Sequence, residues 1–411
     1  MSRSMLNDAK TICFNAIKAC LPDENVKKAL KDLEVHQKVY LLAVGKAAFR
    51  MAKAASEVLD IERGIVISKY GHIEGKIDHV DCYEAGHPLV DENSIKATEE
   101  AIKMCSSLKE DDIVIFLLSG GASALFESPL ISLEELRKLN QQLLNKGIDI
   151  VSINTIRKKL SKVKGGKFGD LCKPAKVYSI ILSDVLSDSL DNIGSGPSVK
   201  DSTDGKAALR ILDERGIQIS DDVRNIILQS ESGTCENCVN QITGSVRILC
   251  KKAMEEAQKL GYTPILLSDQ ADMEACKAGD LMYETILKYK DEKGKICLVL
   301  GGETIVYVKG NGLGGRNQEL VFSQIEHLSD MDHVLLMSVG SDGTDGPTDA
   351  AGGYIDGSSL HKLKEKGLDP ESFLSENDTY HGLKAIDSLI LTGPTGTNVN
   401  DLSIALIDNS K

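Results

Sequence analysis

The feature that most constrains the fold of this chain is a series of short, continuous apolar runs, each followed by a turn and a helix-like segment. Continuous apolar strands are typical of parallel sheets that are buried on both faces, and the intervening helices supply the crossovers. We therefore predict an α/β fold with a mainly parallel sheet in the first half of the chain. The runs that carry this prediction are residues 39–44, 64–68, 80–83, 113–118 and 177–182.

A second α/β unit is expected in the C-terminal part, where helix-like segments again alternate with apolar runs. The polar segment 230–244 separates the two parts, so we predict domains at residues 1–235 and 236–411. Two domains suit 411 residues at about 150 residues each. The expected helices are 245–260, 273–288 and 316–327, and the expected strands are 263–267, 296–300, 304–308, 333–339, 388–391 and 402–407.

Composition excludes several classes of partner. The net charge of -13 argues against nucleic acid, which needs a broad basic face. The run at 113–118 is far shorter than the roughly 18 residues of a membrane-spanning helix, and the first residues lack the apolar core of a signal peptide. We therefore expect a cytoplasmic protein that binds small molecules, without nucleic-acid or membrane partners.

Glycine-rich turns follow many of the apolar runs. Exposed backbone N–H groups in such turns can bind phosphate, although small residues also permit close packing alone. Lys46, Ser119 and Asp184 each lie directly after a predicted strand, and the carboxyl ends of parallel strands meet at one edge. We expect these three to share a site, with Lys46 either a cation for an anionic ligand or an ordinary surface lysine. The turns are Ser119–Ser123, Gly194–Pro197, Gly310–Arg316 and Gly393–Asn398.

The stretch Gly310–Gly315 fits the pattern G-x-G-x-x-G, but the acidic residues that follow it lie before the next strand rather than at its end. We favour an anion site there over a nicotinamide site, with Arg316 offering a planar fork to a carboxylate or phosphate. Each Gly-Lys pair lacks a following Ser or Thr, which excludes the P-loop class of kinase.

Three further patterns leave alternatives open. Asp184, Asp191 and Asp345 could contribute to Mg²⁺ binding or cap turns. The basic stretch 154–167 is either a local anion funnel or a solvated helix face. The pair Cys235 and Cys238 is either a metal or redox site or two incidental thiols in a solvent loop, and no second such pair completes a zinc ribbon.

Taken together, these motifs resemble the bacterial and archaeal glycerate 2-kinase family, whose C-terminal half carries the MOFRL domain. The matching stretches run in family order through nearly the whole chain. One departure is Ala122, where the family often has a third glycine after the serine. The stretches are Val44–Ala48, Gly86–Pro88, Leu118–Gly121, Asn154–Lys158, Lys164–Lys167, Leu182–Asp184, Gly194–Pro197, Gly301–Thr304, Gly314–Glu319, Asp342–Asp349 and Thr392–Asn398.

The resemblance implies a Rossmann-like N-terminal domain and a MOFRL-type α/β C-terminal domain, with the active site in the cleft between them. It implies ATP-dependent phosphorylation of D-glycerate to 2-phosphoglycerate with Mg²⁺, by a monomer or homodimer. Lys46, Arg316 and Asp184 are the expected catalytic residues. The residues expected to bind substrate or phosphate are Ser119, Gly120, Gly121, Ser123, Gly194, Gly196, Gly314, Gly315, Asn317, Thr395 and Asn398.

Two other hypotheses compete with the kinase. A nicotinamide-dependent hydroxypyruvate reductase would use Gly310–Gly315 as its dinucleotide turn. A non-catalytic sugar-acid-binding protein would bind its ligand without turnover. The density of glycine turns in both expected domains makes this second alternative less favoured, whereas an absorbance change of reduced cofactor with hydroxypyruvate, without ATP, would favour the reductase.

Overall fold

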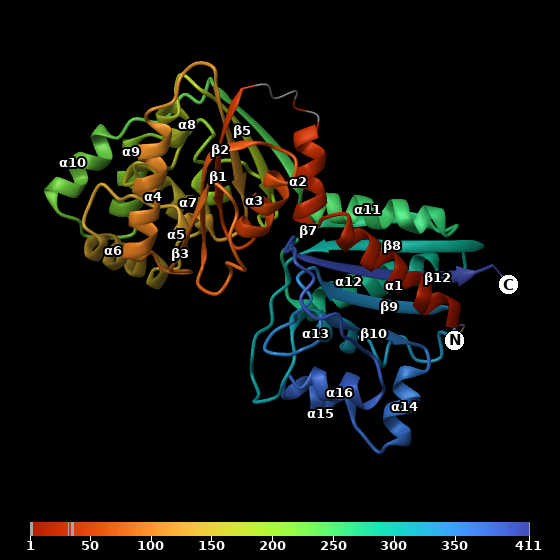
Figure 1. Ribbon diagram of the computed structural model, residues 1–411. Coiled ribbons are helices and arrows are strands. Elements are labelled where there is room, and N and C mark those ends of the chain that lie inside the picture. The colour runs from red at the N-terminus through yellow and green to blue at the C-terminus, as the bar shows by residue number, and fades with distance from the viewer. Residues whose placement is uncertain (1–2, 32, 34–36, 411) are drawn as a thin grey trace. The chain divides into compact units, whose positions relative to one another are not determined.

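The computed structural model describes residues 3–31, 33 and 37–410, which form two compact units. The parallel-sheet unit comprises Pro22–Thr243, and the mixed-sheet unit comprises Met1–Leu21 together with Gly244–Lys411. Each unit has its own sheet (Figure 1), and each has its own apolar core.

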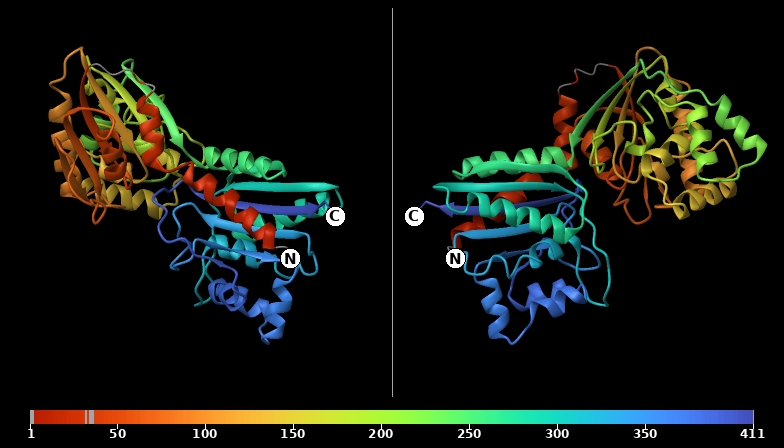
Figure 2. Two further views of the ribbon diagram at one scale, coloured as in Figure 1. Left: turned by 45° about the vertical axis from the view of Figure 1, so that its right-hand side comes forward. Right: turned by 180° about the vertical axis from the view of Figure 1, so that it is seen from behind.

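The division differs from the boundary expected after residue 235 in two ways. Strand β6 (Cys238–Gly244) is the sixth strand of the first sheet, so the chain stays in that unit until residue 243. Helix α1 (Arg3–Lys18) belongs to the mixed-sheet unit, where Asn15 bonds Glu256 and Tyr262 bonds Asp8. The left view of Figure 2 shows this red helix running along the teal and blue sheet.

The sheet of the parallel-sheet unit has the order β3-β2-β1-β4-β5-β6, and its first five strands pair in parallel. Its central strand β4 is buried at every position, which explains the uninterrupted apolar run in the sequence. The predicted parallel α/β fold is confirmed for this part of the chain. Strands β1 to β5 are Lys38–Val44, Ile61–Lys69, Val80–Ala85, Asp112–Leu118 and Lys176–Leu182.

The helices of this unit pack on the sheet or form a smaller cluster of their own. Ser132 caps α6 in the predicted capping box with Glu135. Helices α6, α7, α9 and α10 share a separate apolar cluster that includes Leu143, Ile156 and Leu212. The helices are α2 (Pro22–Lys31), α3 (Ala48–Ser56), α4 (Glu92–Cys105), α5 (Ala122–Leu125), α6 (Leu133–Asn145), α7 (Ile150–Lys159), α8 (Lys167–Leu171), η1 (Ile193–Ser195), α9 (Gly205–Glu214) and α10 (Asp221–Gln229).

The sheet of the mixed-sheet unit has the order β11-β10-β9-β12-β8-β7. Strand β12 lies antiparallel between β8 and β9, so its first residue, Asp401, lies beside Gly302 and Gly340 at the ends of those strands. This pairing brings the start of β12 to the edge where β8 and β9 end. The strands are β7 (Thr263–Ala271), β8 (Gly294–Gly302), β9 (Val334–Gly340), β10 (Gly352–Asp356), β11 (Leu389–Ile390) and β12 (Asp401–Asn409).

Two expectations for this unit are corrected, and one strand was not predicted. Residues 304–308 form no strand, because only Ile305 makes an isolated bridge, to Glu274. The expected helix 316–327 is helical only through Phe322. Strand β10 was not predicted, since it is five residues long and begins with two glycines. The helices are α11 (Val246–Lys259), α12 (Ala275–Tyr289), α13 (Arg316–Phe322), α14 (Ser359–Glu365), α15 (Pro370–Ser375) and α16 (Thr379–Ala385).

Candidate active site

In the parallel-sheet unit, the turns that follow β1 and β4 lock together. Gly45 adopts a φ of 123°, and a Cβ placed there would lie 2.2 Å from Ser119 Oγ, so only glycine fits this close approach. The Lys46 N–H donates to the Gly120 carbonyl at 2.9 Å, and the Ala47 N–H donates to Ser119 Oγ at 3.1 Å. The predicted proximity of Lys46 and Ser119 is therefore present in the structure.

Asp184 and His87 lie against the same glycines. A Cβ on Gly120 would stand 2.1 Å from Asp184 Oδ2, and one on Gly121 would stand 3.0 Å from His87 Cδ2 and 3.5 Å from Lys46 Cγ. Burial, with the nearby Lys46 ammonium, lowers the pKa of His87, so the imidazole is neutral at pH 7. Lys46 is half-buried, and within the described residues it forms no ion pair. A cation, a carboxylate and a neutral imidazole thus surround the Gly120–Gly121 turn.

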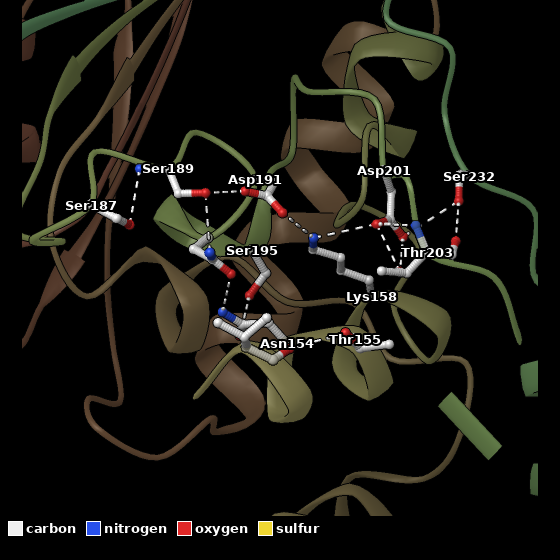
Figure 3. Close-up of polar contacts among 12 residues, drawn as sticks. Asn154, Thr155, Lys158, Ser187, Ser189, Asp191, Ser195, Asp201, Thr203 and Ser232 are labelled. Carbon is white, nitrogen blue, oxygen red and sulfur yellow. Dashed lines mark hydrogen bonds and ion pairs between the residues drawn. The ribbon is translucent and has the colours of Figure 1, made fainter. Parts of the chain in front are cut away.

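The second glycine turn, Gly194–Gly196, packs on the first. Ser195 Oγ lies 3.3 Å from Ser123 Oγ and donates to Asn154 Oδ1 at 3.1 Å. Gly194 adopts a φ of 58°, which favours glycine, and a Cβ there would lie 3.2 Å from the Cβ of Ala122. Figure 3 shows Ser195 and Asn154 beside the Ser189–Asp191 segment.

The basic stretch 154–167 is neither a solvated face nor an open funnel, because Lys158, Lys159 and Lys164 are buried, although Lys162 is exposed. Lys158 and Lys159 are 2% and 0% exposed, and both bind Asp201 (Figure 3 shows Lys158). Lys159 Nζ lies 2.9 Å from Asp201 Oδ2, whereas Lys158 Nζ lies 3.4 Å from both Asp201 and Asp191. Lys158 therefore connects the buried ion-pair network to Asp191, the more exposed carboxylate beside the glycine turn.

In the mixed-sheet unit, Arg316 begins α13 at the edge where β12 starts. Its Nε and Nη2 bind the two oxygens of Asp401 at 2.6 and 3.1 Å, and its Nη1 binds Glu303 Oε1 at 2.7 Å. Burial opposes the charge on Arg316, but the two carboxylates outweigh it and raise the pKa of the guanidinium. Burial also raises the pKa of Asp401, to about 7, in spite of Arg316. Arg316 is thus fixed by two carboxylates from its own unit.

Asp345 caps the start of α13. Its Oδ1 accepts the backbone N–H of Asn317 at 3.1 Å, and its Oδ2 accepts that of Gln318 at 2.9 Å. Burial raises the pKa of this carboxyl, although the N–H donors oppose the shift. Both oxygens are therefore occupied by the helix start, which is the capping alternative left open by the sequence.

The Gly310–Gly315 turn has little free backbone to offer a nucleotide. Asn377 Oδ1 accepts the N–H groups of Lys309 and Gly310, and Asp378 Oδ1 accepts that of Leu313 at 2.8 Å. The Gly312 N–H donates to the carbonyl of Glu376, also at 2.8 Å. A Cβ on Gly314 or Gly315 would collide with Thr379 or Asp345, so these two glycines serve close packing.

The turn before β12 packs on the Ser341–Asp345 turn after β9. Thr395 Oγ1 donates to the carbonyl of Ser341 at 2.5 Å, and the Thr395 N–H donates to Asp342 O at 3.1 Å. Asn398 Oδ1 accepts the Asn400 N–H at 3.4 Å, and Asn400 Nδ2 donates to Glu303 Oε2 at 3.1 Å. Thr395 and Asn398 therefore hold the loop that leads to Asp401.

The predicted site residues thus fall into two groups. Within the parallel-sheet unit, Lys46 and Asp184 adjoin the Ser119–Ser123 turn, and Gly194–Gly196 packs on that turn. Within the mixed-sheet unit, Arg316 and Asn317 lie with Gly314 and Gly315 at the start of α13, and Thr395 and Asn398 hold the neighbouring loop.

Sequence reasoning gave little weight to His87 and missed Asp401, Glu303 and Lys158 as members of these groups. Within residues 3–31, 33 and 37–410, no three His, Cys, Asp or Glu side chains gather in a way that could hold a metal ion. None of the helices in these ranges has the length and apolar character that crossing a membrane requires.

The fold and these turns define a two-unit α/β protein with glycine-rich turns at a sheet edge of each unit. Residues 8–228 match the family model described as a domain of unknown function (DUF4147), and residues 296–401 match the MOFRL family. The chain therefore belongs to the glycerate kinase family, which confirms the resemblance seen in its sequence.

Several relatives cover most of the chain. The D-glycerate 2-kinase of Thermotoga maritima is 49% identical over 96% of this chain and 97% of its own length. The glycerate 2-kinase of Pyrococcus horikoshii is 41% identical over 97% of this chain and 93% of its own. A relative from Agrobacterium vitis with a provisional hydroxypyruvate reductase name is 35% identical over 89% of this chain and 86% of its own.

A solved structure has the same fold. The crystal structure of a glycerate kinase from Thermotoga maritima superposes with a TM-score of 0.95 at 48% identity and covers 98% of this chain and 99% of that one. The predicted α/β class with two sheets is confirmed by this match.

Proposed function

We propose that this protein transfers the γ-phosphoryl group of ATP to the 2-hydroxyl of D-glycerate and forms 2-phospho-D-glycerate. The observation that carries the proposal is the turn Ser119–Gly121 with Lys46, Asp184 and His87 around it, in a chain of the glycerate kinase family. Phosphoryl transfer depends chiefly on positioning and on charge stabilisation, which a cation beside glycine N–H groups supplies.

Lys46 is the residue we assign to the transferring phosphoryl group. Its backbone is fixed by the Gly120 carbonyl, while its ammonium is in no ion pair within the described residues. A cation that is not already neutralised can meet the negative charge that builds up on the phosphoryl oxygens. The N–H groups of Gly120, Gly121 and Gly194 are assigned to the phosphates of ATP, whereas that of Gly196 already donates to the Ile193 carbonyl at 3.0 Å.

Arg316 is assigned to the glycerate carboxylate. A guanidinium has five N–H donors, and the bonds to Asp401 and Glu303 use three of them. Two donors are left in a plane that the carboxylates hold rigid, which suits recognition of a small acid. The proposal requires Lys46 and Arg316 to act on one ATP–glycerate pair.

Asp184 is assigned either to Mg²⁺ or to the reacting hydroxyl. Mg²⁺ prefers one or two carboxylates plus waters and substrate phosphates, and it would neutralise charge on the β- and γ-phosphates. Asp184 beside Gly120 fits such a ligand, and Asp191, held by Lys158, fits a second one. Asp345 does not fit, because both of its oxygens are occupied. Rescue of Asp184→Asn by excess Mg²⁺ supports the metal role, whereas a loss that Mg²⁺ does not rescue supports proton acceptance.

The geometry of the Gly310–Gly315 turn argues against the reductase hypothesis, which needs this turn to bind a dinucleotide. The N–H groups of Gly310 and Gly312, which a dinucleotide would need, already donate to the segment 376–378. A sugar-acid-binding protein without turnover would need neither glycine turn to carry phosphates.

We also propose a cytoplasmic location and a monomeric or homodimeric state, without nucleic-acid or membrane partners. All ten cysteines are free thiols, as is usual in a reducing compartment.

A coupled ADP-release assay tests the function. With D-glycerate, ATP and Mg²⁺ we expect ADP release that depends on glycerate. Reduced nicotinamide cofactor with hydroxypyruvate, in the absence of ATP, should show no absorbance change. ADP release that is independent of glycerate, or cofactor oxidation by hydroxypyruvate, would reject the proposal.

A further inference from the structure

The pair Cys235 and Cys238 takes no part in the proposed function, yet it occupies a defined turn. The Cys238 N–H donates to the Cys235 carbonyl at 3.1 Å, and Cys235 adopts a φ of 54°. Asp170 fixes this turn by accepting the N–H groups of Thr234 and Cys235 at 2.7 and 3.1 Å. The two thiols are therefore held in place rather than lying in a loose loop.

Both sulfurs face one point on helix α8. A Cβ on Gly169 would lie 2.5 Å from Cys238 Sγ and 3.0 Å from Cys235 Sγ, so glycine makes room for the two sulfurs side by side. The neighbouring Cys238 thiol lowers the pKa of Cys235, whereas Cys235 and burial raise the pKa of Cys238. One thiol of the pair is thus the more acidic, as in reactive dithiols with this spacing.

The surroundings favour thiol chemistry over metal binding. No group of three or more metal-ligating side chains occurs in the described part of the chain, so a closed zinc site is not available to this pair. Both thiols are half-buried at the surface of the unit, whereas Cys105 and Cys172 are fully buried. A dissolved reagent can therefore reach the pair more readily than those buried thiols.

We propose that Cys235 and Cys238 form a reversible dithiol site that exchanges with low-molecular-weight disulfides. The Cys235 thiolate attacks one sulfur of the disulfide; a new S–S bond forms, and the other half leaves as a thiolate that takes up a proton. Cys238 then gives up its proton and attacks the Cys235 sulfur, which releases the second half as a thiol. Two electrons pass from the pair to the disulfide, which becomes two thiols.

Oxidation of the two cysteines would affect the Gly194–Gly196 turn, which is assigned above to ATP, through a chain of hydrogen bonds. Cys235 Sγ donates to the Gly166 carbonyl at 3.2 Å. The Gly166 N–H donates to Gly196 O at 2.7 Å, and the Gly165 N–H donates to Ser195 O at 3.0 Å. Disulfide formation removes the thiol proton and leaves the Gly166 carbonyl without this donor. We therefore expect the oxidised protein to have a higher KM for ATP, a consequence that rests on the proposed function.

The test uses the full chain incubated with oxidised and then with reduced glutathione. Oxidation should remove two reactive thiols and two hydrogen atoms per chain by intact mass, and peptide mapping should join Cys235 to Cys238. Cys235→Ser and Cys238→Ser should each prevent this loss, while Cys82→Ser, the matched half-buried control, should not. Reduction should restore both thiols.

The site is rejected if the pair stays reduced, if a glutathione adduct persists on one cysteine, or if Cys105 and Cys172 are joined instead. These readouts do not depend on catalysis, so failure of the kinase proposal would leave them unchanged. An unchanged KM for ATP after complete oxidation would reject the coupling to Gly166.

Discussion

The two glycine-rich edges of this protein use similar residues in different ways. In the parallel-sheet unit, glycines bring Ser119 and Asp184 against the backbone, and the ammonium of Lys46 is in no ion pair of the described residues. In the mixed-sheet unit, the cation Arg316 is fixed by Asp401 and Glu303. Backbone N–H groups at the turn 310–315 likewise donate to neighbouring side chains, those of Asn377 and Asp378.

The difference teaches that a glycine turn in a sequence does not by itself identify an anion site. What matters is whether the N–H groups and nearby cations have partners inside the protein. By this criterion, the edge of the parallel-sheet unit suits an interaction with the charge that builds up on a transferring phosphoryl group. The edge of the mixed-sheet unit suits the binding of a substrate carboxylate by a guanidinium that is held in a fixed position. The following predictions test that contrast.

The largest effect is expected for Lys46→Ala. Loss of a cation that acts on the transition state should lower kcat by about 10²-fold or more, with little change in melting temperature. Steady-state kinetics at saturating ATP and glycerate measure this. The exposed Lys53, on the helix that follows, is the matched control, and Lys53→Ala should retain wild-type kcat. A change in KM alone would remove Lys46 from this role.

Arg316→Ala should affect stability as well as activity, unlike Lys46→Ala. It leaves the buried Asp401 without its bidentate partner, and we expect a loss of about 2 kcal/mol, less than for a fully buried pair because Arg316 is partly exposed. Urea unfolding measures the loss. Asp401→Asn should be less destabilising, since it leaves no unpaired buried carboxylate. If both variants unfold like the wild type, the claim that Asp401 and Glu303 hold Arg316 in a fixed position is refuted.

A pair of glycine substitutions separates function from packing. Gly120→Ala places a methyl group against the Asp184 carboxylate and should lower kcat about tenfold with little loss of stability. Gly312→Ala places one 2.6 Å from the Glu376 carbonyl and should lower the melting temperature by a few degrees. Activity assays and thermal melts on both variants decide the matter, and the reverse pattern would contradict the contrast.

The smallest effect is expected for the pH dependence of the free energy of unfolding, which arises from Asp401 in the mixed-sheet unit. Burial raises the pKa of Asp401 from 3.8 to about 7, so between these values the folded state binds a proton that the unfolded state has released. Wild-type stability should therefore fall as pH rises from about 4 to about 7, and Asp401→Asn should lack this part of the slope. The difference in unfolding free energy between the wild type and Asp401→Asn should change by about 1 kcal/mol from pH 6 to pH 7. Urea unfolding measures both proteins at both pH values. An equal stability difference at the two pH values would show that the Asp401 carboxyl does not titrate in this range.

The sequence predicted the first edge better than the second for a physical reason. Parallel strands end at one edge, so residues just after strands, such as Lys46 and Asp184, could be grouped without coordinates. Asp401 reaches Arg316 only because β12 runs antiparallel between β8 and β9, and no local pattern indicates this. Lys158 likewise looked exposed, because its partner Asp201 lies 43 residues further along the chain.

Identification of the product by ³¹P and ¹H NMR tests the central claim most directly. Incubation of the protein with D-glycerate, ATP and Mg²⁺ should give ADP and a phosphate monoester coupled to the single proton on C2 of glycerate. A monoester coupled to the two protons on C3, or inorganic phosphate as the only phosphorus product besides ADP, would contradict the account.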